Sequence, residues 1–418
     1  MAVVADQLQE PFRIRMLLTD TRYRSATIQV IALVLFMLAI AWLVDNTIRN
    51  LDALGKGFTF GFLANPAGYD INQRLLEYDS QSTNARAAAL GILNTLLVAA
   101  LGCTAATVIG VLAGVMRLSK NWIVARLMTV YVEAFRNVPV LIWILLIAAA
   151  VNDLLPAPNA FRGDNPAATM SFWDSVALTN RGFYVPEPLF SASLGSIDVG
   201  GYFKVSLDLL AILAALIGGI VASNQVGVWA TRRQEETGDR PPVFWPRLGL
   251  VVVPPLLVLV LLGFHLGYPE LRGFNFVGGI HLRDSLVALW IALSVYTGAF
   301  IAENVRAGIL AVSKGQTEAA SALGLRPNLT MRLVILPQAL RVIIPPLISQ
   351  YLNLTKNSSL AIAVGYMDAT GTLGGITLNQ TGREMECILL LMGFYLVVSL
   401  SISFVMNVYN ERVKLRER

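Results

Sequence analysis

The stretch KGQTEAASALGLRPNLTMRLVILPQAL, residues 314–340, is a charged interruption in a chain that is otherwise strongly apolar. Ser313 and Gln316 have the spacing of a capping box, which predicts a short helix through TEAASAL. Gly324 stands where a left-handed residue would end that helix, and Pro327 favours the start of a second one. We therefore expect a folded helix-turn-helix element rather than an irregular loop.

The composition indicates an integral membrane protein. Hydrophobic residues make up 55% of the 418 residues and charged residues only 14%, which is too apolar for an ordinary soluble globule. Cys103 and Cys387 lie in apolar stretches, and His265 and His281 are far apart. We therefore expect no disulfide, no metal site and no catalytic residue. The net charge of +5 is too small to indicate a nucleic-acid partner.

Segments long enough to cross a bilayer recur along the whole chain. A spanning helix needs about 20 mostly apolar residues, and eight segments meet that need, so an all-α multi-pass fold is predicted. The first reads as an uncleaved helix, since no small-residue cleavage pattern follows it. The predicted spans are 28–44, 88–116, 127–150, 205–222, 248–266, 284–305, 338–355 and 386–408.

The lysines and arginines between these spans favour one orientation. With eight crossings, most of them fall on the side of the N-terminus, and such loops stay in the cytoplasm. Both termini and the 314–340 stretch are therefore expected in the cytoplasm. The two long outer segments, 45–87 and 151–204, are polar and rich in Asn, Asp, Gly and Pro, which is typical of loop-dominated connections.

The interrupting stretch resembles a known signature. Glu318-Ala319-Ala320, Gly324 and Val334-Ile335-Leu336-Pro337 are spaced as in the E-A-A loop of permease subunits of ABC importers, with Val334 in place of the usual isoleucine. In that family the loop, here 313–337, docks on a separate ATPase. The resemblance assigns ATPase coupling to Glu318, Ala319, Ala320, Gly324, Leu336 and Pro337. The chain has no phosphate-binding G-x-x-x-x-G-K-[ST] motif, so we expect ATP to be used by the partner and no cofactor to be bound here.

Four further stretches are similar to the polar amino-acid permeases of ABC importers. They are LGILNTLLVAALG (90–102), YVEAFRNVPVLIWIL (131–145), YTGAFIAENVRAGI (296–309) and LRVIIPPLISQYLNLTKNSSLAIAVG (340–365). The resemblance implies a type I ABC importer transmembrane fold with a five-helix core in a permease domain, 88–408. An insertion at 151–283 adds two helices, as in the branch that handles L-amino acids broadly. Residues 1–87 and 409–418 flank that domain.

The resemblance also implies a place and partners. We expect a bacterial inner-membrane subunit that imports polar or general L-amino acids with ABC ATPase subunits, a second permease, identical or different, and a periplasmic amino-acid-binding protein. Two other classes of protein fit the sequence less well. A secondary, ion-coupled amino-acid transporter would work without an ATPase and show internal repeats, which are not evident. A membrane enzyme would need a catalytic constellation that two scattered histidines do not offer.

Polar residues inside predicted spans are candidates for a substrate pathway, because charges there are costly and tend to face a cavity or each other. The candidates are Asn94, Thr95, Tyr296, Glu303, Asn353 and Lys356. Glu303 and Arg306 are three residues apart on one helix, as are Glu133 and Arg136 on another. Glu303 therefore has two interpretations: contact with a substrate ammonium, or an intrahelical ion pair.

Overall fold

The computed structural model describes residue 18 and residues 21–163, 165–199, 203–239 and 241–413. It falls into two units, divided between Phe62 and Leu63. The described part of the first unit is chiefly one helix, α2 (Thr21–Ala53), whose side chains are almost all exposed; a turn of 3₁₀-helix, η1 (Gly61–Ala64), follows. The segment before residue 18 and the tail after residue 413, both expected in the cytoplasm, lie outside the described residues.

Eight helices in the described part of the chain are long and apolar enough to cross a membrane, which confirms the predicted helical multi-pass membrane fold. The spans are built on α2, α3 (Asn84–Met116), α5 (Val140–Leu154), α6 (Leu207–Thr237), α7 (Phe244–Leu261), α8 (Asp284–Leu310), α11 (Leu336–Asn357) and α13 (Glu384–Val413).

The predicted span 127–150 is wrong as a single helix. It is divided into α4 (Trp122–Asn137) and α5, with Val138 in an extended conformation and Pro139 at the N-cap of α5. A proline disfavours helical geometry in the residue before it and lacks an N–H for the helix ladder. Glu133 and Arg136 consequently belong to α4, a separate helix outside the candidate spans.

Helix α8 is the centre of the second unit. Of its most apolar stretch, 72% is buried, and it packs against α3, α4, α5 and α11. Two glycines let α3 approach closely: a Cβ on Gly110 would lie 2.5 Å from Cβ of Ile301, and one on Gly114 would lie 2.6 Å from the carbonyl oxygen of Ala302. Their four-residue spacing therefore marks close helix packing.

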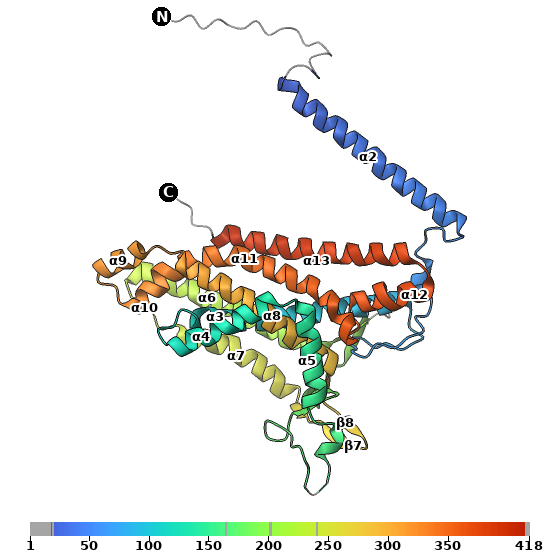
Figure 1. Ribbon diagram of the computed structural model, residues 1–418. Coiled ribbons are helices and arrows are strands. Elements are labelled where there is room, and N and C mark those ends of the chain that lie inside the picture. The colour runs from blue at the N-terminus through green and yellow to red at the C-terminus, as the bar shows by residue number, and fades with distance from the viewer. Residues whose placement is uncertain (1–17, 19–20, 164, 200–202, 240, 414–418) are drawn as a thin grey trace, which may run out of the picture. The chain divides into compact units, whose positions relative to one another are not determined.

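The two ends of the second unit differ in structure. At one end, which we call the loop end, α9 (Lys314–Ala322) and α10 (Pro327–Thr330) lie together, and a π-helical turn, η3 (Met331–Ile335), leads into α11 (Figure 1). At the opposite end lie η4 (Ser358–Val364), the π-helical η5 (Thr370–Thr377) and α12 (Leu378–Thr381). A cluster of buried residues that includes Tyr69, Ile71 and Tyr78 packs segment 67–78 against this opposite end.

The insertion forms short antiparallel strands on either side of the α6–α7 hairpin, so the expectation of loop-dominated connections is wrong for this part. Strand β2 pairs with β1 and β9, β3 pairs with β6, β4 with β5, and β7 with β8. The strands are β1 (Ala177–Thr179), β2 (Gly182–Val185), β3 (Glu187–Phe190), β4 (Ser196–Val199), β5 (Phe203–Ser206), β6 (Phe264–Gly267), β7 (Glu270–Arg272), β8 (Asn275–Val277) and β9 (Ile280–Arg283). A short 3₁₀-helix, η2 (Pro158–Phe161), precedes them.

Candidate functional site

The helix-turn-helix at the loop end is formed as predicted, apart from its cap. Ser313 takes the N-cap position of α9, as predicted. It makes no side-chain capping hydrogen bond, so the predicted capping box is not formed. The Gln316 side chain instead accepts a hydrogen bond from the Gln338 amide at 3.2 Å. Since Gln338 belongs to α11, this bond ties α9 to the helix that follows the loop.

Gly324 ends α9 in the left-handed conformation, with φ +75°. The Leu325 N–H donates to the Ala320 carbonyl at 3.1 Å, and the Gly324 N–H donates to the Ser321 carbonyl at 2.9 Å. These two bonds form a Schellman motif, which satisfies carbonyls that the helix end would leave unpaired. The glycine therefore fixes the angle at which the chain leaves α9.

The loop presents one small residue inward and several apolar residues outward. Ala320 is buried, whereas Glu318 and Ala319 are exposed. Leu323 is 82% exposed, and Leu329, Met331 and Leu336 are also exposed. Pro327 is at the first turn of α10 and Pro337 at that of α11. Apolar side chains gathered on an exposed element of this kind are typical of a protein interface.

A cluster of charged side chains joins three helices close to the loop end. The Glu303 carboxylate of α8 pairs with Arg306 at 2.6 Å and with Arg117, the residue that caps α3. Arg117 also lies 3.9 Å from Glu133 of α4. The Arg117 side chain is only 9% exposed. The carboxylates therefore offset the free-energy cost of burying its positive charge.

The ion pair expected between Glu303 and Arg306 is therefore formed, and Arg117 is a partner that the sequence did not identify. The signal for it was its position directly after the span 88–116, at the same end as Glu303. Arg136 does not pair with a carboxylate among the described residues; its guanidinium lies 5.5 Å from the Phe300 ring centroid. Tyr296 contacts the same ring, with centroids 5.1 Å apart.

Asn94 and Thr95 hold the opposite end of the unit together. Both side chains are fully buried. The Asn94 amide donates to the carbonyls of Gln73 at 3.0 Å and Met367 at 2.9 Å, and the Ala369 N–H donates to the Thr95 hydroxyl at 3.0 Å. These bonds join α3 to the segment before it and to the segment before η5.

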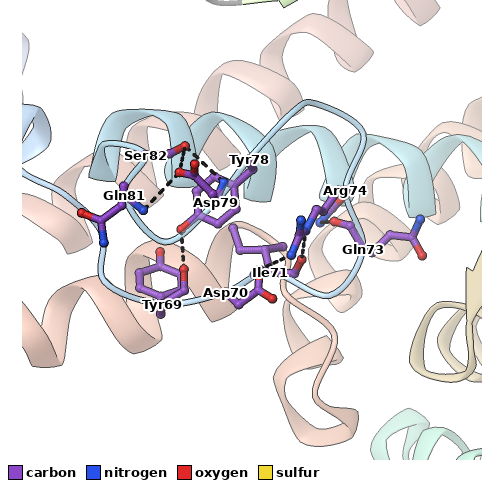
Figure 2. Close-up of polar contacts among 10 residues, drawn as sticks. Tyr69, Asp70, Ile71, Gln73, Arg74, Tyr78, Asp79, Gln81 and Ser82 are labelled. Atoms are coloured by element: carbon purple, nitrogen blue, oxygen red, sulfur yellow. Dashed lines mark hydrogen bonds and ion pairs between the residues drawn. The ribbon is translucent and has the colours of Figure 1, made fainter.

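Figure 2 shows the polar contacts inside the segment that precedes α3. The Tyr78 hydroxyl donates to the Tyr69 carbonyl at 2.8 Å, and the Tyr69 hydroxyl is 2.9 Å from that of Thr377 in η5. Burial raises the pKa of Tyr69 and of Tyr78, so both phenols stay protonated and available as donors. The segment is thus a fixed part of the fold, a feature that its polar composition did not reveal.

The remaining pathway candidates lie elsewhere. Asn353 and Lys356 are exposed on α11, and among the described residues no hydrogen bond or ion pair joins either side chain to Glu303 or Asn94. The structure therefore does not gather the six candidates into one site: Asn94 and Thr95 lie at the opposite end from Glu303, and Tyr296 contacts Phe300.

Comparison with known proteins identifies the family. Residues 240–415 match the model of the binding-protein-dependent transport system inner membrane component. The chain is 55% identical to the glutamate/glutamine/aspartate/asparagine transport system permease protein BztB of Rhodobacter capsulatus, with all of both chains covered. It is 44% identical to the general L-amino acid transport system permease protein AapQ of Rhizobium johnstonii, over 96% of this chain and 94% of that one.

A third relative, the putative amino-acid ABC transporter permease protein YhdX of Escherichia coli, is 44% identical over 94% of this chain and 95% of its own. The chain therefore belongs to the family of inner-membrane permease components of binding-protein-dependent transport systems, as its E-A-A loop predicts. It is a multi-pass inner-membrane protein. Such components work with an ATPase that hydrolyses ATP, a binding protein and a permease partner, and bind no cofactor themselves.

Proposed function

We propose that this permease translocates polar amino acids, with the acidic amino acids and their amides as the first candidates. The support is the 55% identity over the full length to a permease whose name specifies glutamate, glutamine, aspartate and asparagine. The broader range in the name of the second relative sets the wider class, L-amino acids in general.

The proposed coupling element is the α9–α10 loop. We propose that Glu318, Ala319 and the exposed apolar side chains around Leu323 contact the ATPase. Ala320 and Gly324 act differently: Ala320 is buried within the permease, and Gly324 sets the turn. Leu336 and Pro337 begin α11, and through it a movement of the loop would reach the membrane.

The proposed orientation places the loop end and both termini in the cytoplasm. Residues 88–408 then form the transport domain, with 151–283 as an insertion and with 1–87 and 409–418 flanking it. Lysine and arginine counts support this arrangement. In a chain without native cysteines, Ser191→Cys, which lies after β3, should react with an impermeant thiol reagent in intact cells. Gln234→Cys, near the end of α6, should react only after the inner face is opened; its labelling from outside would contradict the orientation.

The proposed pathway runs along the exposed face of α11. Val342, Pro346, Ser349, Asn353 and Lys356 are spaced three or four residues apart and are all exposed, so they form one stripe on the helix. Polar and charged groups on such a stripe are costly in lipid, which favours a wet pathway or a permease partner there. We propose a supporting role beneath this pathway for Asn94, Thr95 and Tyr296. Glu303 would then mark the end of the pathway that lies closest to the loop end.

Uptake measured with the assembled complex tests the substrate. Proteoliposomes that contain this chain, its permease partner, the ATPase and the binding protein are supplied with labelled glutamate and with unlabelled competitors. We expect glutamate, glutamine, aspartate and asparagine to compete, and leucine or lysine to compete only if the broader range applies. Transport unaffected by any amino acid would contradict the proposed substrate class.

A further inference from the structure

The α6–α7 hairpin carries a polar hollow near its connecting turn. The hollow, of about 610 Å³, is lined by residues of both helices, among them Asn224, Thr231, Arg232, Glu235 and Arg247. Two guanidinium groups and one carboxylate line it, which leaves an excess of positive charge. Among the described residues no salt bridge engages Arg232 or Arg247, although the Glu235 carboxylate lines the same hollow.

An apolar hollow adjoins it along α7. Its volume is about 480 Å³, and Pro241, Val243, Phe244, Leu248 and Val251 line it together with Ser223 and Arg247. Arg247 borders both hollows. The two together make an amphipathic site, with charge at one end and hydrocarbon along the other.

Arg247 is held in place by its neighbours. Its Nε donates to the Ser223 hydroxyl at 3.3 Å, and Ser223 is buried. The guanidinium lies beside Gly227, where a Cβ would come within 3.3 Å of Cζ. The helix thus leaves room for the guanidinium and directs it toward the hollow, which is the arrangement expected of a binding group rather than of a solvated surface arginine.

Aromatic side chains mark the depth of this site. Trp229 on α6 and Phe244 and Trp245 on α7 are all exposed, Trp245 to 74%. Tryptophan is enriched where the hydrocarbon of a bilayer meets its headgroups. In a bilayer, these aromatic residues would place Arg232 and Arg247 near the level of the lipid phosphates.

We propose that the α6–α7 hairpin binds a membrane phospholipid, with its phosphodiester between Arg232 and Arg247 and one acyl chain in the hollow beside Leu248. Guanidinium groups suit this ligand because they donate paired hydrogen bonds to phosphate oxygens. The hairpin packs chiefly on itself, so a lipid held across both helices would add a connection between them at the membrane surface.

Native mass spectrometry of the detergent-solubilised transporter complex tests this proposal, with phosphatidylglycerol as the probe. Arg247→Gln and Arg232→Gln should each weaken phosphatidylglycerol binding by roughly fivefold, the effect of about 1 kcal/mol per basic residue near a lipid surface. The matched control is Arg233→Gln, because Arg233 is adjacent to Arg232 but lies over the Trp229 ring, 5.5 Å from its centroid, and should leave binding unchanged.

One further variant and one competitor complete the test. Gly227→Ile crowds the Arg247 guanidinium without removing charge and should also lower binding, which covers the case in which Arg247→Gln fails to assemble. Inorganic phosphate at millimolar concentration should not displace the lipid; displacement would assign the site to a free anion. Equal loss of phosphatidylglycerol in Arg233→Gln and Arg247→Gln, or no loss in any variant, would overturn the proposal.

Discussion

Replacement of Gly324 by alanine isolates the role of backbone conformation in the coupling loop. A Cβ at this position would meet nothing within 4 Å, so the substitution introduces no clash. The φ of +75° remains, and the left-handed region costs an L-residue about 1–2 kcal/mol. If the ATPase binds only the loop that keeps this turn, the apparent affinity of the permease for the ATPase should fall roughly 5- to 30-fold.

Gly315→Ala is the matched control. Gly315 lies in the first turn of α9, its φ is not positive, and the nearest atom to an added Cβ is the Ser313 hydroxyl oxygen at 3.9 Å. Alanine is the better helix former there, so binding should be unchanged. Gly324→Asn should fall between wild type and Gly324→Ala, since asparagine tolerates the left-handed region better, and Gly324→Val should be the most damaging.

The assay is a titration of the ATPase subunit onto permease complexes in nanodiscs, with ATP hydrolysis as the signal and the membrane-inserted amount of each variant measured separately. The expected order of the half-maximal concentration is Gly315→Ala, Gly324→Asn, Gly324→Ala and Gly324→Val, from lowest to highest. Equal values for Gly315→Ala and Gly324→Ala would refute the reasoning, because the conformational cost would then have no effect on docking.

Three other changes have distinct expected outcomes. Glu303→Gln leaves the buried Arg117 guanidinium with only the more distant Glu133 carboxylate, 3.9 Å away, so the amount of assembled complex should decline. Full transport per complex in Glu303→Gln, Arg306→Gln would exclude a contact with substrate. Asn94→Ala should lower the melting temperature, because two buried carbonyls lose their donor at about 1–3 kcal/mol, and a change in KM with normal stability would instead indicate a pathway role. Burial lowers the pKa of His281 from its usual 6.5, so the fold favours the neutral ring. The protection factors of the β9 amides, which are exchange rates corrected for the intrinsic rate at each pH, should be highest above pH 6.5 and decrease as the pH falls below it. Protection that increases as the pH falls would contradict this.

Local patterns predicted the elements whose signals lie within one turn or one span. The left-handed end of α9, the start of α10 at Pro327 and the eight apolar helices are of this kind. The break between α4 and α5 also has a local signal, since Pro139 disfavours a helical Val138. Prolines nevertheless lie inside α7 and α11, and the apolar residues on both sides of Pro139 favoured one span. A proline in an apolar stretch therefore does not by itself decide where a helix of this chain ends.

Contacts between distant segments could not be predicted in this way. Strand β2 pairs with β9, and Tyr184 faces His281 across that pair, yet nothing in either short strand identifies the other. Arg117 reaches Glu303 from a different helix, and the Asn94 amide nitrogen donates to the carbonyls of Gln73 and Met367. Periodicity can assign a polar residue to a span, whereas its partner depends on how the helices pack.

The central claim is that this permease transports only when a separate ATPase acts on it through the α9–α10 loop. The most direct measurement is uptake of labelled glutamate into proteoliposomes, with and without the ATPase subunit, under either ATP or an imposed proton or sodium gradient. The account predicts uptake only when the ATPase and ATP are both present, and its loss in Gly324→Val complexes. Gradient-driven uptake without the ATPase would contradict the account and identify a secondary transporter.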